Sequence, residues 1–283
     1  MLNFRGKISN ASDSNAKGAL GQKQPASKTR WLAGLLIFIL VATASFVAHI
    51  PASWVLKQVT QNHLIPTNIQ LNQAQGTLWN GQAQLSLLEP NKTLELGQLH
   101  WQLSALSLLS LNVNTDLNLQ TERGGMRANL STGLLNQTQI EVKDLQGQIP
   151  VNDLQPLLPP AYRNLGDLQG QLMLNKIGLL WDTSSNWLNE LSGSMEFSQL
   201  DVMGVTFSKL TLTPILQDKN IRLETLGRGA GWNLTGQTLL NLKTYQADFT
   251  LQADTPESMP DWTDLMMRKK TPTLATFKQQ GRF

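Results

Sequence analysis

Hydrophobic and polar residues alternate along most of the chain from about residue 66 onward. From 109 to 119 the odd positions carry Leu, Val and Thr, whereas the even positions from 110 to 120 carry Ser, Asn, Asp and Gln. The same alternation runs over residues 245–254. A period of two indicates strands with one dry face and one wet face, which is typical of an antiparallel sheet. A parallel sheet would show solid apolar runs separated by amphipathic helices, and those are missing.

Some of these strands change phase partway along. Leu94 and Leu96 occupy one register, whereas Leu99 and Trp101 occupy the other, and a second change of phase follows Leu174. One extra residue of this kind is how a β-bulge bends a strand while its apolar side stays inward. Turn residues also recur at short spacing, which is typical of an all-β meander. We therefore expect a mainly β protein built on a large, curved antiparallel sheet.

Two stretches interrupt the alternation. Residues 149–165 contain four prolines, which no central strand tolerates. This segment is interpreted as a connection, with room for one helical turn, which would join two halves, 66–148 and 166–283, of a single β domain over residues 51–283. Near the C-terminus, residues 260–270 predict a short helix. Its apolar face, formed by Trp262, Leu265 and Met266, is expected to pack under the sheet in preference to docking a partner.

The most apolar segment lies near the N-terminus. Residues 31–50 contain no formally charged side chain, and they directly follow Lys28 and Arg30. About 20 residues of helix cross the hydrocarbon layer of a bilayer, so the sequence predicts a single transmembrane helix over residues 31–50. The side chains assigned to this membrane anchor are Trp31, Leu35, Leu36, Ile39 and Phe46.

Two other interpretations of this segment compete with the anchor. Ala42 and Ala44 fit the small-x-small pattern of a cleaved signal peptide, but a leader of residues 1–30 is long and the apolar character continues past that point. A buried core helix would keep a polar stripe, and this segment has none. The anchor is therefore favoured over both.

The basic charge of the chain is concentrated before the apolar segment. Six Lys or Arg residues precede Trp31 against the single acid Asp13, within a formal net charge of +3 for the whole chain. This excess places the N-terminus in the cytoplasm and the bulk of the chain across the membrane. Residues 1–30 are expected to form a disordered cytoplasmic tail. Because no basic cluster with interleaved aromatics follows Arg30, we expect no nucleic-acid partner.

The 283 residues offer few groups for chemistry. The absence of cysteine excludes disulfides, thiolate nucleophiles and cysteine-ligated metals. His49, His63 and His100 are far apart in sequence, so they do not predict a metal centre. No nucleophile elbow, phosphate loop or dinucleotide fingerprint occurs. We therefore predict no catalytic residue, no metal and no cofactor, and we disfavour a hydrolase that would use scattered carboxylates. Only 15% of the residues are charged, which favours an extracytoplasmic β protein.

The motif that stands out is Gly-Thr-Leu-Trp-Asn-Gly at residues 76–81. Gly76 permits a turn or a close backbone approach, and Trp79 supplies a large apolar plate with one donor. One interpretation is a bulge packed by an aromatic side chain, and the other is a recognition surface for another subunit. The candidate interaction or structural motif consists of Gly76, Trp79, Gly81 and Trp101.

Several segments in order resemble the type II secretion system protein N family, also called general secretion pathway protein N. They are the leader and span, residues 50–56, the motif at 76–81, and residues 96–103, 145–158 and 168–174. The resemblance covers roughly residues 31–283, and it extends distantly to AsmA-like proteins.

This resemblance implies a single-pass protein of the bacterial inner membrane, with its C-terminal domain in the periplasm. Such a protein would be a non-catalytic, accessory subunit of the machine that exports folded proteins across the outer membrane, and its partners would be other subunits of the inner-membrane platform. AsmA-like proteins have curved sheets with an apolar groove and are linked to lipid handling. The alternative function is therefore lipid binding or lipid transfer by the apolar face of the sheet.

Overall fold

The computed structural model describes residues 27–61, 68–89, 92–135, 138–155, 168–202 and 204–282. The chain divides into two compact units, residues 1–47 and 48–283. The expected cytoplasmic tail lies outside the described residues up to position 26, as do the prolines at 156, 159 and 160. The helices are α1 (Ser27–Ala48), α2 (Ala52–Gln61), α3 (Ala105–Leu109), α4 (Val151–Leu154), the 3₁₀ turn η3 (Pro256–Ser258) and α5 (Thr263–Met266).

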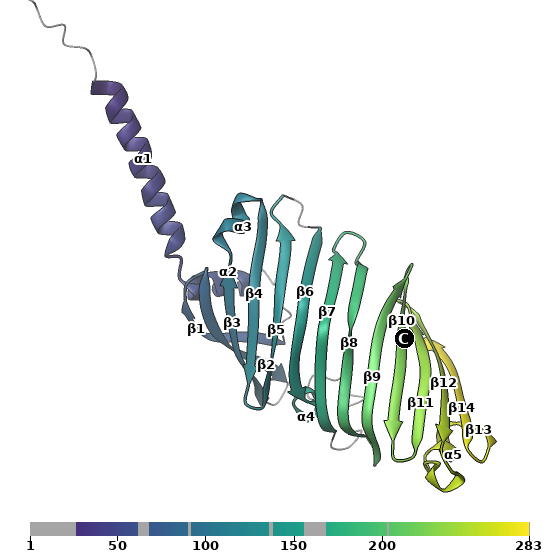
Figure 1. Cartoon of the computed structure of the whole chain (residues 1–283). Coiled ribbons are helices and arrows are strands. Elements are labelled where there is room, and N and C mark those ends of the chain that lie inside the picture. The colour runs from purple at the N-terminus through teal and green to yellow at the C-terminus, as the bar shows by residue number, and fades with distance from the viewer. Residues whose placement is uncertain are drawn as a thin grey trace, which may run out of the picture. The chain divides into compact units, whose positions relative to one another are not determined.

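The second unit is built on one antiparallel sheet of 14 strands (Figure 1). Neighbours in the sheet follow the chain order from β1 to β12, after which come β14 and then β13. The strands are β1 (Ile69–Gly76), β2 (Asn80–Glu89), β3 (Lys92–Leu103), β4 (Asn112–Thr121), β5 (Gly124–Gly133), β6 (Gln139–Pro150), β7 (Gln169–Asp182), β8 (Trp187–Val202), β9 (Val205–Gln217), β10 (Asn220–Gly229), β11 (Trp232–Leu240), β12 (Thr244–Ala253), β13 (Arg268–Thr271) and β14 (Leu274–Arg282). The predicted antiparallel, mainly β architecture is confirmed.

Register shifts occur where the sequence changes phase. In the β2–β3 pair, Leu85 lies opposite Gly97 and Ser86 lies opposite Glu95, so Leu96 is the extra residue of a bulge. The β7–β8 pair shifts again after Asn175. Gly97 adopts a φ of 143° at the first of these bulges, a conformation that glycine reaches without a side-chain clash. The bulges keep the apolar side chains on one side of strands that bend and twist.

One apolar face runs across the whole sheet. Leu99 on β3 pairs with Leu119 on β4, which in turn pairs with Met126 on β5. Toward the C-terminal strands, Phe197 on β8 pairs with Leu210 on β9. Because directly opposed residues of an antiparallel pair share a face, these pairs place the leucine-rich side of each strand on one continuous surface.

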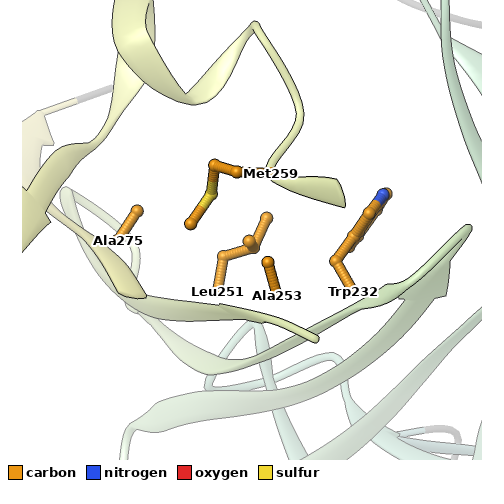
Figure 2. Close-up of a cluster of buried hydrophobic side chains, with 5 residues drawn as sticks. All are labelled: Trp232, Leu251, Ala253, Met259 and Ala275. Carbon is orange, nitrogen blue, oxygen red and sulfur yellow. The ribbon is translucent and has the colours of Figure 1, made fainter. Parts of the chain in front are cut away.

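Short segments cover two parts of this apolar face. The central cluster, packed by α4, consists of Val151, Leu168, Leu172 and Leu200. The C-terminal cluster, packed by the connection between β12 and β13, consists of Trp232, Leu251, Ala253, Met259 and Ala275. Figure 2 shows Met259 of that connection lying over Leu251 of the sheet. The rings of Phe207 and Trp262 meet Trp232 edge to face, with centroids 5.1 and 6.2 Å away. Such aromatic pairs stabilise the cluster beyond the area they bury.

The C-terminal helix is shorter than predicted. Helix α5 ends at Met266, and the basic residues 268–270 belong to strand β13 instead of the end of a helix. Trp262 packs against the C-terminal cluster as expected, but Leu265 is 89% exposed and Met266 is 61% exposed. Because the helix ends at Met266, the next residue, Met267, is extended and packs against the cluster in place of Leu265 and Met266.

Two strand boundaries also differ from the sequence prediction. Residues 109 and 111 precede β4, because the chain forms helix α3 and a turn before the strand begins at Asn112. The proline-rich connection begins later than predicted. Ile149 and Pro150 are the last residues of β6, where the lost N–H of a proline removes little of the ladder. The sheet continues across this connection, since β6 pairs directly with β7.

Candidate functional site

The turn between β1 and β2 carries the glycine–tryptophan motif. The Thr77 N–H donates to the carbonyl of Asn80 at 2.9 Å and closes the turn. Gly76 has a φ of 86°, and a Cβ there would lie 2.5 Å from the Asn80 carbonyl oxygen. Only glycine therefore fits this position without strain.

Trp101 on β3 packs across the same turn. Its indole N–H donates to the Leu78 carbonyl at 3.2 Å, and a Cβ on Gly81 would collide with its ring. The N–H of Leu103 donates to the carbonyl of Trp79 at 2.7 Å. Gly76, Gly81 and Trp101 thus pack tightly at this turn, and Trp79 is joined to β3 through its backbone carbonyl. Trp79 is half-buried, so part of its surface also stays available for contacts.

The same turn holds the segment that arrives from helix α1. Pro51 forms a β-bridge with Thr77, and the N–H of Leu78 donates to the carbonyl of Ile50 at 2.9 Å. Helix α2 follows at once, and its first residue, Ala52, is fully buried. The motif therefore fixes where the N-terminal segment joins the sheet.

Four of the five residues assigned to the anchor lie in the described part of α1. Leu35, Leu36, Ile39 and Phe46 are between 55% and 75% exposed, whereas the side chain of Trp31 lies outside the described residues. Large apolar side chains on every side of a helix are unusual at a water-exposed surface. No helix within the described part of the chain is found long and apolar enough to cross a membrane, so the transmembrane helix stays a prediction.

The polar face of the sheet forms a shallow hollow of about 490 Å³ over β3 to β6. Three residues that line it, His100, Asp116 and Asn129, are engaged in cross-strand pairs. His100 Nε2 lies 3.3 Å from Gln82 Oε1, and the Asn129 amide donates to Asp116 at 2.8 Å. Each pair spans directly opposed residues. The polar groups therefore stabilise neighbouring strands rather than converge on one reacting atom.

The other titratable side chains of the described residues likewise do not form a catalytic arrangement. Among the described residues, no three His, Asp or Glu side chains are placed to hold a metal ion. The turn between β7 and β8 holds one perturbed carboxyl, Asp182. The hydroxyl and the backbone N–H of Ser184 donate to it at 2.6 and 2.8 Å, and these bonds hold the pKa of Asp182 below its usual range. This is the pattern of a polar turn, and it shows no catalytic partner.

Sequence reasoning missed the exposed leucines at one end of the strands. This near end is the one at which β1 passes into β2, and the connections β3–β4, β5–β6, β7–β8 and β11–β12 lie there too. The β3–β4 and β5–β6 connections expose five leucines, which are Leu106, Leu109, Leu111, Leu134 and Leu135. A signal was present, because Ser104, Ser107 and Ser110 recur at the three-residue spacing of a helix in an uncharged segment, whereas the sequence prediction starts a strand at residue 109.

These features define a single-sheet antiparallel β protein without a recognisable catalytic constellation in its described residues. Comparison with protein families is more specific. The type II secretion system (T2SS) protein N family matches residues 67–267, which is most of the chain, and the chain belongs to this family. The resemblance found in the sequence is thereby confirmed. Neither the curated proteins nor the solved structures give a match to this chain.

Proposed function

We propose that this type II secretion component is a non-catalytic, inner-membrane scaffold. In this proposal α1 anchors the chain with its N-terminus in the cytoplasm, and the sheet lies in the periplasm, where it contacts other subunits of the secretion platform. The observation that carries the proposal is the family match over residues 67–267. The uncharged run over residues 31–50 and the packed junction at Pro51 support the anchor.

The two edge strands of the sheet, β1 and β13, differ in how well they suit a contact with another protein. Strand β13 carries Arg268, Lys269 and Lys270, and consecutive charges on an edge strand oppose pairing with another chain. Strand β1 has no charged residue, and its end leads into the motif around Trp79. The β1 edge, together with Trp79, is therefore the favoured contact for a second subunit.

Site-specific photo-crosslinking in cells tests this scaffold role. A photoreactive residue at Gln70 on the β1 edge is expected to capture a subunit of the secretion machine, whereas the matched control at Lys270 on the β13 edge captures none. Deletion of the gene is expected to leave exported enzymes in the periplasm, and the full chain restores export. If neither edge captures a secretion subunit in cells that secrete normally, the scaffold role is wrong.

A second function rests on the apolar face. The side chains of Leu117, Leu119, Met126 and Leu130 on β4 and β5 are only half-buried, whereas the buried clusters lie at α4 and at the C-terminal strands. An apolar sheet face with such partial cover suits the acyl chain of a lipid. Native mass spectrometry of gently extracted full-length protein tests this alternative, because a spectrum without any lipid adduct would exclude stable lipid binding.

A further inference from the structure

Leucines form a continuous exposed strip at the near end of the strands. We define the leucine rim as Leu106, Leu109, Leu111, Leu134 and Leu135. Leu106 is 77% exposed, Leu109 is 83% exposed and Leu135 is 82% exposed. Exposed leucines scattered singly need no explanation, but a contiguous set on neighbouring turns marks a binding surface.

Helix α3 is folded with Ser107 inside and with Leu106 and Leu109 outside, while Leu108 is half-buried. Ser107 is buried; its hydroxyl donates to the Ser104 carbonyl at 2.7 Å and accepts from the Asn114 N–H at 3.2 Å. These bonds hold the serine face of the turn against β4. Leu106 and Leu109, three residues apart on the opposite face, therefore face outward together. A turn that contacts water would show the reverse arrangement.

Hydrogen bonds connect the leucine rim to the place where the N-terminal segment joins the sheet. The Leu134 N–H donates to the Leu111 carbonyl at 2.9 Å, which joins the two leucine-bearing turns. Leu103, just before α3, donates to Trp79, and Leu78 donates to Ile50. Ile50 follows the end of α1 by two residues, a reach of about 7 Å at most for an extended chain. The end of the proposed anchor is thus tied to the same end of the strands as the rim.

The composition of the rim favours lipid over a protein partner. Residues 104–111 and 133–135 contain no charged residue and no aromatic residue. Protein interfaces concentrate their binding energy in Trp, Tyr and Arg, which are missing here. An uncharged segment with exposed leucines can bury them among acyl chains without the cost of desolvating a charge.

We infer that the leucine rim inserts into the surface of the same bilayer that α1 enters, and so seats the sheet with its near end on the membrane. This inference rests on the proposed anchor. A rim of this kind turns a single tether into a two-point attachment. The sheet then has a fixed direction relative to the bilayer, with its opposite end held away from the lipid.

Single-cysteine variants of the full chain test the inference, because the protein has no cysteine of its own. The rim variants are Leu109→Cys and Leu135→Cys, the matched control is the exposed Ala230→Cys at the opposite end of the strands, and Phe38→Cys reports on α1. Each is labelled with an environment-sensitive fluorophore and reconstituted into vesicles of phosphatidylethanolamine and phosphatidylglycerol. The labels at 38, 109 and 135 are expected to shift their emission to the blue and to be quenched by a lipid-borne quencher. The label at 230 is expected to respond only to an aqueous quencher.

The outcomes separate the two proposals. If the label at 38 is in lipid while the labels at 109 and 135 respond as the label at 230 does, the rim inference is wrong and the anchor stands. If the label at 38 also responds only to the aqueous quencher, the anchor is wrong and the rim inference is lost with it. Labels at 109 and 135 that reach neither quencher once other secretion subunits are added would identify a protein surface, and this result also overturns the inference.

Discussion

The connections at the two ends of the strands differ in polarity and in packing. At the far end, polar and charged connections fold back over the sheet: Arg123 pairs with Asp153 of α4, and Ser258 donates to the Gly231 carbonyl at 2.8 Å. At the near end, helix α3 and the β5–β6 turn carry no charge and leave their leucines exposed. Hydrophobic composition alone therefore does not locate the core, because leucines are buried at one end and exposed at the other.

The far end also holds the more complete packing. Leu251 has no exposed surface, and Trp232 is 6% exposed beneath the connection that contains Met259. Loss of a buried leucine removes its burial energy and leaves a cavity, whereas loss of an exposed one removes neither. Stability is therefore expected to depend on the far end, and interaction with other molecules on the near end.

Truncation of a buried and of an exposed leucine compares the two ends directly. We expect Leu251→Ala to lower the free energy of unfolding by about 2–5 kcal/mol, because the site is fully buried against Trp232 and Ala275. The matched change Leu109→Ala at the near end is expected to alter it by less than about 0.5 kcal/mol. Urea unfolding of the full chain in detergent, followed by tryptophan fluorescence, measures both. Equal losses of unfolding free energy at the two positions would contradict the expectation that stability depends mainly on the far end.

A second substitution tests the junction at the near end. Gly81→Ala places a Cβ against the Trp101 ring and 2.8 Å from the Gln75 carbonyl oxygen, so we expect a loss of about 1–3 kcal/mol. The control is Gly178→Ala, where the nearest atom is the movable hydroxyl of Ser192 at 2.8 Å. The same unfolding assay applies. If Gly81→Ala costs no more than the control, Trp101 does not pack as tightly as this account requires.

A third substitution tests the inverted turn. Ser107→Ala leaves the Asn114 N–H without its acceptor and removes the bond to Ser104, so we expect a loss of about 1–2 kcal/mol, with faster amide exchange confined to α3 and the start of β4. Ser110→Ala removes only a bond to the Ser107 carbonyl and is the milder control. Hydrogen exchange read by mass spectrometry measures both. Exchange that rises equally throughout the sheet would contradict a local role.

Much of this arrangement could be predicted from sequence, and the failures have a common cause. Period-two patterning gave the sheet, and phase changes at Gly97 and after Leu174 gave the bulges, since both depend on local alternation. The extra turn at 104–111 could not be found in this way. Its last residues, Leu109 and Leu111, continue the alternation of the following strand, whereas a capping bond from Ser107 N–H to Ser104 Oγ, at 3.4 Å, helps to hold the segment as a short helix. Likewise, the packing of Trp262 under the sheet could be predicted from the apolar face of 260–270, but the end of helix α5 at Met266 depends on tertiary packing that the local pattern does not encode.

A weaker, pH-dependent change is expected at the polar β7–β8 turn of the near end. The bonds from Ser184 stabilise the ionised form of Asp182 and lower its pKa in the folded state, so they contribute stability at pH values above the pKa of an unfolded aspartate. This contribution is lost as the pH falls through the lowered folded value, because the protonated carboxyl accepts these bonds poorly. We expect faster amide exchange at Ser184 and Ser185 in acid, and Asp182→Asn should show that behaviour at neutral pH. The leucine-bearing turns have no titrating group, and their exchange should keep the ordinary dependence on pH. A similar acid-induced loosening at α3 would mean that the polar and apolar parts of the near end act as one unit.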